Sequence, residues 1–367
     1  MSRRNSAVWP ALLAVAWLAP LAAAPGDPPA DAPSYPPVAP GRPLSFPRDH
    51  GAHPSYRTEW WYVTGWLHSP GGEPLGFQVT FFRSRPNLAQ GNPSRFAPDQ
   101  LLFAHAALSD PIVGHLTHEQ RSARAGFGLA EAEQGDADVH IGDWSLARSA
   151  DDSYRIRVHG REIRFDLTLV PTRPPLLQGD AGYSRKGPLA AEASYYYSQP
   201  QLKVKGTLGR DGRRQDVQGS AWLDHEWSST MLGRDAVGWD WLGINLDDGG
   251  ALMAFRIRDG AGRALWTYAS RHRGDGTRVA IAARAVNLAP IRRWRSPRTG
   301  AEYPVALRVA AGDLAFDLVP LQDDQELDAR ASTGNVYWEG AVTAVAGGKP
   351  IGRGYLELTG YFRPLKL

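Results

Sequence analysis

Cysteine is absent from the 367-residue sequence. Disulfide bonds, thiol nucleophiles and cysteine-ligated metal sites are therefore excluded. The net charge is also small. It is formally +3, and Arg3 and Arg4 near the N-terminus supply two of these positive charges. This balance does not indicate a nucleic-acid-binding protein. The single basic run, residues 292–298 (RRWRSPR), is more typical of a solvated loop.

Long apolar runs are also scarce. The clearest one, residues 9–21, is too short to span a bilayer comfortably. It follows two arginines and precedes three alanines at residues 22–24, so residues 1–24 are predicted to be a cleaved signal peptide. We therefore expect a periplasmic or secreted protein without a membrane-spanning segment in its mature chain. Residues 25–45, rich in proline and alanine, are predicted to form a linker.

Helical periodicity is nearly missing, and the best candidate is a turn or two at residues 116–124. Alternation of apolar and polar residues is frequent instead, and residues 163–170 (IRFDLTLV) are the clearest example. It recurs at residues 76–83, 103–108, 155–159, 202–206, 252–257, 305–309 and 355–362. The sequence therefore predicts an all-β fold of two antiparallel barrels or sandwiches. We place the N-terminal domain at residues 46–233 and the C-terminal domain at residues 234–367.

Residues able to do chemistry are concentrated in two stretches, 221–229 (AWLDHEWSS) and 238–248 (GWDWLGINLDD). In an extended strand, His225 and Trp227 point to one face, while Asp224 and Glu226 point to the other. One interpretation is an acid–base histidine beside an aromatic wall that tolerates positive charge. The alternative is a buried polar brace between two domains.

Two further histidine positions have both functional and structural interpretations. His50 and His53 could share a metal ion with a distant acid, although hydrogen bonding to the backbone is favoured on this glycine-containing loop. We expect no metal and no cofactor. His105 lies on an apolar strand face, which favours a core role over ligand binding.

A glycine-edged loop at residues 182–187 (GYSRKG) precedes three tyrosines. It could hold an anion, close a pocket mouth or simply connect two strands. The sequence has no G-x-S-x-G elbow and no H-E-x-x-H helix, and no phosphate-cradling glycine loop is visible.

Six segments together resemble one known family: residues 46–67, 177–187, 193–198, 221–229, 238–249 and 354–362. They are similar to the secreted lipocalin-like AttH-like proteins, which are often labelled predicted hydrolases and are related to carotenoid 1,2-hydratases. The resemblance covers residues 45–367. It implies two tandem lipocalin-like antiparallel β-barrels packed side by side, with a pocket at or near their junction.

The carotenoid hydratases use a histidine and a tryptophan two residues apart, followed by a tyrosine–aspartate pair on a later strand. His225 and Trp227 match the first pair. Residues 252–257 (LMAFRI), the later strand here, contain neither tyrosine nor aspartate. Asp240 is the candidate for the missing acid.

These observations lead to three hypotheses about function, all with an apolar, isoprenoid or lipid-like ligand. The first is a hydratase that adds water to a C=C bond, which requires a proton donor, an aromatic wall facing the cation and a base for the water. The second is a non-catalytic carrier or accessory protein of an ABC-transporter system, with a permease as partner. The third, a hydrolase, has only the family label in its favour. The candidate catalytic residues are His225, Trp227, Asp240, Asp224 and Glu226, and the candidate ligand-binding residues are Glu59, Trp60, Trp61, His105, Tyr196, Trp239 and Trp241.

Overall fold

The structure is a computed structural model that describes residues 35–86, 92–94, 96–210 and 212–365. The predicted signal peptide and the first part of the predicted linker lie outside the described residues. Within the described ranges, no helix has the length and apolar character needed to cross a bilayer.

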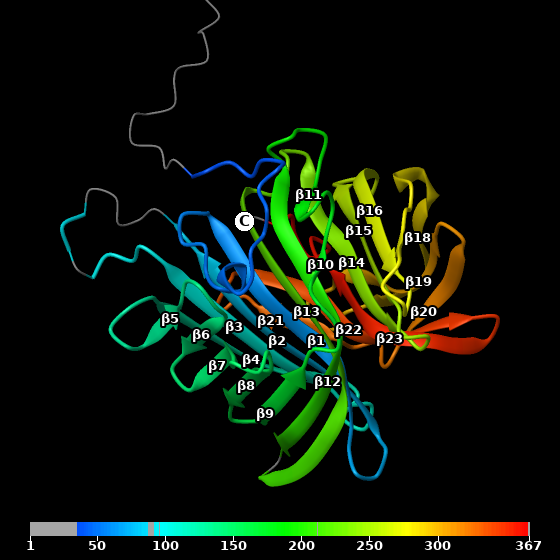
Figure 1. Cartoon of the computed structure of the whole chain (residues 1–367). Coiled ribbons are helices and arrows are strands. Elements are labelled where there is room, and N and C mark those ends of the chain that lie inside the picture. Colours follow the sequence, from blue (N-terminus) through cyan, green and yellow to red (C-terminus); the bar gives the residue numbers. More distant parts are fainter. Residues whose placement is uncertain (1–34, 87–91, 95, 211, 366–367) are drawn as a thin grey trace, which may run out of the picture. The chain divides into compact units, whose positions relative to one another are not determined.

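Two antiparallel β-sheets account for nearly all regular structure in the described chain, and only two short 3-10 helices, η1 (Arg48–His50) and η2 (Ala283–Ala285), accompany them. The thirteen strands of the first sheet are β1 (Thr58–His68), β2 (Pro74–Ser84), β3 (Leu101–Ser109), β4 (Leu116–Arg124), β5 (Ala130–Ala132), β6 (Asp138–Ile141), β7 (Trp144–Arg148), β8 (Tyr154–His159), β9 (Ile163–Val170), β10 (Leu176–Leu177), β11 (Tyr183–Arg185), β12 (Ala193–Arg210) and β13 (Arg213–Thr230). The ten strands of the second sheet are β14 (Ala236–Leu246), β15 (Ala251–Asp259), β16 (Ala264–His272), β17 (Arg278–Val279), β18 (Val286–Arg295), β19 (Glu302–Ala311), β20 (Leu314–Pro320), β21 (Glu326–Ala329), β22 (Asn335–Ala346) and β23 (Lys349–Leu358). The predicted fold class, two lipocalin-like antiparallel sheets, is confirmed (Figure 1).

The first sheet runs β4-β3-β2-β1-β13-β12-β9-β8-β7-β6-β5, and its two ends approach each other because β4 contacts β6 and β9. Side chains of β4 complete this closure. Arg121 donates hydrogen bonds to the carbonyl oxygens of Ile141 and His159. The Glu119 carboxylate accepts backbone N–H groups of residues 161–163. The sheet is therefore nearly closed, which covers edges that would otherwise be open to pairing.

The second sheet runs β17-β16-β15-β14-β23-β22-β20-β19-β18. Its β16 and β18 strands are in contact, and Arg256 of β15 donates a hydrogen bond to the carbonyl oxygen of Leu288 in β18. The first sheet ends at Thr230 and the second begins at Ala236, yet the chain from Tyr35 onward forms one compact unit. The division into two domains therefore stays a prediction.

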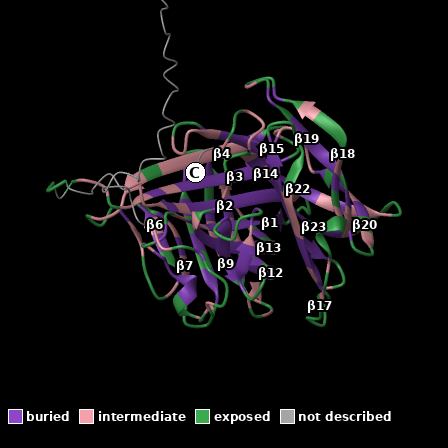
Figure 2. Cartoon of the chain, turned by 90° about the horizontal axis from the view of Figure 1, so that it is seen from above, coloured by how far each residue is buried: buried purple, intermediate pink, exposed green. Residues whose placement is uncertain are grey.

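The middle strands of the two sheets pack against each other. Strands β8 and β9 alternate between buried and exposed residues, whereas β1, β2 and the second half of β13 are buried on both faces. The reason is that β22, β23 and β14 cover their outer faces. Figure 2 shows this as buried colouring that runs through β1, β2, β13 and β14. A cluster of large side chains fills this contact: Tyr62, Trp66, Tyr196, Trp222, Trp241, Met253, Phe255, Ile257 and Tyr355.

The close approach of the sheets requires a glycine at residue 76. A Cβ atom there would lie 2.5 Å from the Cβ of Ala341 and 2.9 Å from the hydroxyl oxygen of Tyr355. Nearby, the Trp66 indole N–H donates to the carbonyl oxygen of Gly354 at 3.0 Å. Packing and hydrogen bonding thus join β1 and β2 directly to β22 and β23.

Two local predictions were wrong. Residues 116–124 form strand β4 rather than a helical turn. The prediction failed because both faces of this strand carry polar contacts, so its sequence lacks strict alternation. His118 and Gln120 bond the backbone of Asp328, while Arg121 and Glu119 bond the first sheet. The predicted strand at residues 355–362 ends at Leu358. The other alternating segments lie in β2, β3, β8, β9, β12, β15 and β19.

Candidate functional site

A cavity of about 300 Å³ lies between the two sheets. Its apolar walls are Trp60, Tyr62, Phe82 and Phe103 from the first sheet and Trp239, Trp241, Val336 and Tyr337 from the second. Five residues with carboxyl side chains line it: Glu59 from β1, Asp224 and Glu226 from β13, Glu339 from β22 and Glu357 from β23. A mostly apolar cavity with a few convergent polar groups is the usual form of a small-molecule site.

Strand register places these carboxyls. In the first sheet, Trp60, Glu226 and Tyr196 are partners across β1, β13 and β12. In the second, Trp241, Glu357 and Glu339 are partners across β14, β23 and β22. Partners in neighbouring strands point to the same face, so each sheet presents a row that combines aromatic and acidic residues to the cavity.

Glu339 and Glu357 have strongly perturbed acidity. Burial raises the pKa of Glu339 well above its usual range, and the negative charge of Glu357 raises it further. Burial also raises the pKa of Glu357 to about 7, with smaller contributions from the charges of Glu226 and Asp224. Two interacting carboxyls titrate as a pair. At neutral pH this pair therefore retains a proton that it can donate inside an apolar cavity.

Asp224 is surrounded by hydrogen-bond donors. Its carboxylate accepts from the Tyr196 hydroxyl at 2.7 Å, the Trp222 indole N–H at 2.7 Å and the Ser198 hydroxyl. Burial raises the pKa of Asp224 while these donors oppose the rise, and the resulting value is about 7. Both protonation states are accessible near neutral pH, which suits a residue that exchanges protons.

Glu226 is paired with a buried lysine. Lys186 Nζ lies 2.7 Å from Glu226 Oε1 and also contacts the rings of Tyr196 and Phe255. Burial lowers the pKa of Lys186, and the charge of Glu226 opposes that effect. Three roles were considered for residues 182–187. Lys186 points inward to Glu226 and is therefore not free to bind an anion. Residues 183–185 form strand β11.

The two sheets contribute aromatic rings to one wall. Trp60 of β1 stacks on Trp239 of β14, with ring centroids 6.4 Å apart and planes 17° apart. Tyr62 meets Trp241 edge to face at 5.3 Å. Indole faces carry the negative electrostatic potential that favours a nearby cation.

His105 joins the sheets at the side of the cavity. Its Nδ1 lies 2.6 Å from the Tyr337 hydroxyl and its Nε2 lies 2.8 Å from Ser332 Oγ. Burial lowers the pKa of His105 to about 3, so the ring is neutral. His105 is thus part of the cavity wall and of a buried network.

His225 and Trp227 lie on the opposite face of β13, inside the first sheet, as the predicted alternation requires. His225 Nε2 is 2.9 Å from Glu59 Oε1, and its Nδ1 is 3.1 Å from the carbonyl oxygen of Asp49. Trp61 stacks on His225 at 4.7 Å. These residues form an interior network, and His225, Trp227 and Trp61 are not among those that line the cavity.

Asp240 faces away from the cavity. Its carboxylate bonds Arg256 and Arg258 and accepts the Tyr361 hydroxyl at 2.9 Å. Trp239 and Trp241, its neighbours in β14, point to the other face and line the cavity. The structure therefore separates Asp240 from both His225 and the cavity carboxyls.

Glu339 and Glu357 were missed by the sequence analysis. Each lies beside aromatic residues, in YWEG (337–340) and GYLELTGYF (354–362) respectively. An acidic residue next to aromatic residues in a strand was the sequence signal that could have identified them. Their pairing depends on the β22–β23 register, which the sequence did not reveal.

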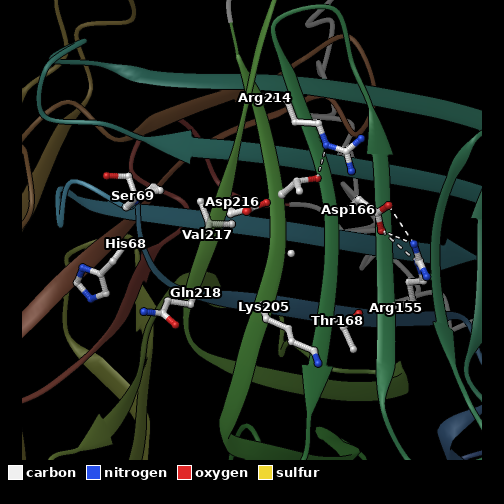
Figure 3. Close-up of a pocket in the computed structure, with 13 residues that line it drawn as sticks. His68, Ser69, Arg155, Asp166, Thr168, Lys205, Arg214, Asp216, Val217 and Gln218 are labelled. Carbon is white, nitrogen blue, oxygen red and sulfur yellow. Dashed lines mark hydrogen bonds and ion pairs between the residues drawn. The ribbon is translucent and has the colours of Figure 1, made fainter.

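A larger hollow, about 620 Å³, lies over β12 and β13 on the outer surface of the first sheet (Figure 3). Its lining residues are exposed or half-buried except Val217, and Arg155 and Asp166 pair with each other at its rim. It is a polar surface hollow without aromatic walls. The cavity between the sheets is the better candidate site.

The chain belongs to the AttH-like family, whose model matches residues 37–361. It is similar to the crystal structure of a candidate AttH from Nitrosomonas europaea, at 53% identity and a TM-score of 0.83, over 89% of this chain and 99% of that chain. It also shares its fold with kievitone hydratase from Nectria haematococca, at 15% identity and a TM-score of 0.66, over 90% of this chain and 99% of that chain. No curated protein matches the sequence. The predicted family resemblance is thereby confirmed.

Proposed function

We propose that this protein is a hydratase-like enzyme that adds water to a C=C bond of an apolar, isoprenoid or lipid-like ligand in the cavity between the two sheets. The observation that carries the proposal is the Glu339–Glu357 pair, which holds a proton beside aromatic walls. The fold shared with kievitone hydratase supports the same reaction class. We also propose a periplasmic or secreted location, supported by residues 1–24.

The proposed reaction begins at the carboxyl pair. The proton of Glu339 or Glu357 moves to one alkene carbon and forms a C–H bond, which leaves a tertiary carbocation on the other carbon. Trp60, Trp239 and Trp241 face that cation, and such contacts contribute about 0.5–2 kcal/mol each.

Water then completes the addition. Its oxygen bonds the cationic carbon, and its surplus proton goes to a neighbouring carboxylate, for which Asp224 is best placed by its accessible pKa. Transfer of that proton from Asp224 to the Glu339–Glu357 pair restores the starting state. Positioned acid–base groups typically contribute about 10²–10⁴-fold in rate.

This proposal moves the reaction away from His225 and Trp227. Both residues are buried on the far side of β13, where His225 has hydrogen-bond and stacking partners and His53 stacks on Trp227. Their proposed role is to hold β1 and β13 in place. Asp224 and Glu226, from the original candidate set, remain in the proposed site.

A non-catalytic carrier is the second candidate, because the same aromatic walls would bind an apolar ligand without reaction. An ABC-transporter permease would then be the receiving partner. The raised pKa values of Asp224, Glu339 and Glu357 favour the enzyme, since a carrier of apolar cargo does not need buried carboxyls that hold protons near neutral pH.

Hydrolysis is less well supported. Ser332 and His105 form the nearest nucleophile-like pair in the cavity wall, but Gln120 Nε2 donates to the Asp328 carbonyl and thereby turns its Oε1 toward Ser332. The Ser332 hydroxyl donates to that oxygen, so His105 Nε2 is the donor to Ser332 Oγ. A histidine in this state cannot accept the serine proton.

The test begins with native mass spectrometry of the purified protein to identify a co-purified ligand. That ligand and a panel of trisubstituted isoprenoid alkenes, including citronellol, are then incubated with the protein in H₂O and in D₂O. A hydratase yields a product heavier by one water that carries one carbon-bound deuterium when made in D₂O. Glu357→Gln and Glu339→Gln should each lower turnover by at least about 10²-fold.

Glu162→Gln, at an exposed position between β8 and β9, is the matched control and should leave turnover unchanged. Binding of the co-purified ligand without conversion by the wild type would favour the carrier. Equal turnover by the wild type and both cavity variants would show that Glu339 and Glu357 are not the proton donors.

A further inference from the structure

Three side-chain atoms meet inside the first sheet, behind the cavity wall. Nδ1 of His53 lies 2.7 Å from Oε1 of Glu59, and Nε2 of His225 lies 2.9 Å from the same oxygen. Among the described residues, these three side chains form a group whose possible ligand atoms all lie within 4.8 Å of one another. All three are buried.

The outer nitrogen of each ring has an oxygen partner. His53 Nε2 lies 3.1 Å from Oδ1 of Asp49, a carboxylate that is also paired with Arg48. His225 Nδ1 lies 3.1 Å from the backbone carbonyl oxygen of Asp49, which can only accept. Both outer nitrogens therefore carry hydrogen.

The inner nitrogens follow from this assignment. In a neutral imidazole, one nitrogen carries the hydrogen and the other presents a lone pair. When both rings are neutral, Nδ1 of His53 and Nε2 of His225 direct lone pairs toward Glu59 Oε1, which is itself an acceptor. The three electron pairs then need a positive charge between them, supplied either by a proton on His53 or by a bound metal ion. Burial lowers the pKa of His53, but the Glu59 and Asp49 carboxylates outweigh burial and raise it, so a metal ion would displace that proton. Metal-bound histidines characteristically donate their other N–H to a carboxylate or a backbone carbonyl, as both rings do here.

The surroundings fix this geometry. Oε2 of Glu59 is held by Arg83 Nε at 2.7 Å and by the backbone N–H of His53 at 2.8 Å, while Oε1 faces the two rings and lies 3.1 Å from the same backbone N–H. His53 stacks on Trp227 with centroids 3.7 Å apart and planes 6° apart. Trp61 stacks on His225. Preorganised ligands of this kind need little ordering on metal binding.

We infer that His53, Glu59 and His225 form a binding site for a divalent transition metal, with Zn²⁺ as the favoured ion. The donor set of two imidazoles and one carboxylate suits zinc, whose bonds to nitrogen and oxygen are about 2.0–2.2 Å. Tetrahedral bonds of that length place ligand atoms roughly 3.3 Å apart. The two short contacts would open by about half an ångström.

The role of the metal would be structural. It would tie the segment around His53 to β1 and β13, the two strands that carry Trp60, Asp224 and Glu226 on their other face. His50, the other histidine of the predicted metal motif, lies outside this group, and its Nδ1 is 2.7 Å from the Tyr197 hydroxyl. This inference does not depend on the proposed hydration reaction, and its test uses no substrate.

The first test uses the wild-type protein, purified without a histidine tag and without chelator from zinc-supplemented medium. Elemental analysis should find about one zinc per chain. Chelation should lower the melting temperature, and zinc should restore it. Co²⁺ in place of zinc should give the visible absorption of a tetrahedral site with nitrogen and oxygen ligands.

Variants assign the ligands. His53→Gln and His225→Gln should lose the metal, whereas His140→Gln, which changes a partly buried histidine of β6, should keep it. Asp49→Asn keeps all three ligands but weakens the acceptor behind His53, so zinc affinity should fall about 10–100-fold. That variant remains informative if the ligand variants do not fold.

Two results would overturn the inference. One is a wild type that is purified without metal and whose melting temperature does not respond to Zn²⁺, Co²⁺, Fe²⁺ or Mn²⁺, in which case protons supply the positive charge between the three groups. The other is a zinc content that both histidine variants retain, which would place the metal elsewhere.

Discussion

Glu339 and Glu357 lie directly opposite each other on β22 and β23, on the face of the second sheet that meets the first. Like charges at opposed positions destabilise a sheet. The pair avoids this cost by keeping a proton at neutral pH. Burial raises both pKa values, and the charge of Glu357 raises that of Glu339 further.

This pair makes stability dependent on pH. A carboxyl whose pKa is raised on folding stabilises the protein below its unfolded pKa, and the contribution is lost as pH rises through the folded value. For Glu357 this interval runs from 4.5 to about 7. We expect the contribution of Glu357 to the free energy of unfolding, taken as the difference between the wild type and Glu357→Gln, to fall by on the order of 2 kcal/mol between about pH 5 and about pH 8.

Glu357→Gln should flatten this dependence, because the amide does not titrate. Urea unfolding across the pH range measures the effect in both proteins, and Glu162→Gln serves as the exposed control. An identical pH dependence of stability in the wild type and Glu357→Gln would mean that Glu357 does not change its protonation over this interval.

Lys186 and Glu226 should be strongly coupled. Replacing Lys186 by Met leaves a buried carboxylate without its cation, and Glu226→Gln leaves a buried ammonium without its anion. Each change should cost roughly 3 kcal/mol of stability, and the double variant should cost much less than the sum. Chemical denaturation of the four proteins of the cycle measures the coupling.

The exposed pair Arg308–Asp317, with a similar separation of 2.8 Å, is the matched control. Its coupling should be much weaker than that of the buried pair, because solvent screens exposed charges. Equal coupling energies in the two cycles would contradict the idea that burial makes the Lys186–Glu226 pair important.

Gly76→Ala should destabilise the contact between the sheets by roughly 2 kcal/mol, because the added methyl group would overlap Ala341. Gly260→Ala is the control, since a Cβ atom there meets only Val237 Cγ1 at 3.8 Å. Thermal unfolding compares them. Similar melting temperatures for both variants would indicate that the sheets can separate slightly without loss of stability.

Ser332→Ala should leave turnover within about twofold of wild type and reduce stability by about 1 kcal/mol, the usual contribution of one hydrogen bond. The loss arises because His105 and Gln120 both lose a partner. Turnover of the identified ligand and urea unfolding measure the two quantities. Abolished turnover with unchanged stability would instead support a serine nucleophile.

Much of the fold could be predicted from residue alternation, because in a half-buried strand such as β9 apolar residues face the core and polar residues face solvent. The same logic divided His225 and Trp227 from Asp224 and Glu226. It failed at β4, where both faces carry polar contacts and the alternation disappears.

The site was only partly predictable, since alternation does not reveal what covers each face. The candidate residues that do line the cavity include Trp60, Trp239, Trp241 and the two acids of β13. The candidate Asp240 does not, because it forms ion pairs with two arginines that follow it by sixteen and eighteen residues. Glu339 and Glu357 needed the register of two strands, which depends on the whole second sheet.

Alternate residues of β13 serve two separate compartments, the interior network on one face and the cavity on the other. A slip of one residue would move His225 toward the cavity and drive Asp224 and Glu226 among the interior aromatics. Substitutions within residues 221–229 can be accommodated one at a time, but an insertion or deletion exchanges every side chain at once. We therefore expect the length of this segment to be far less variable in evolution than its composition.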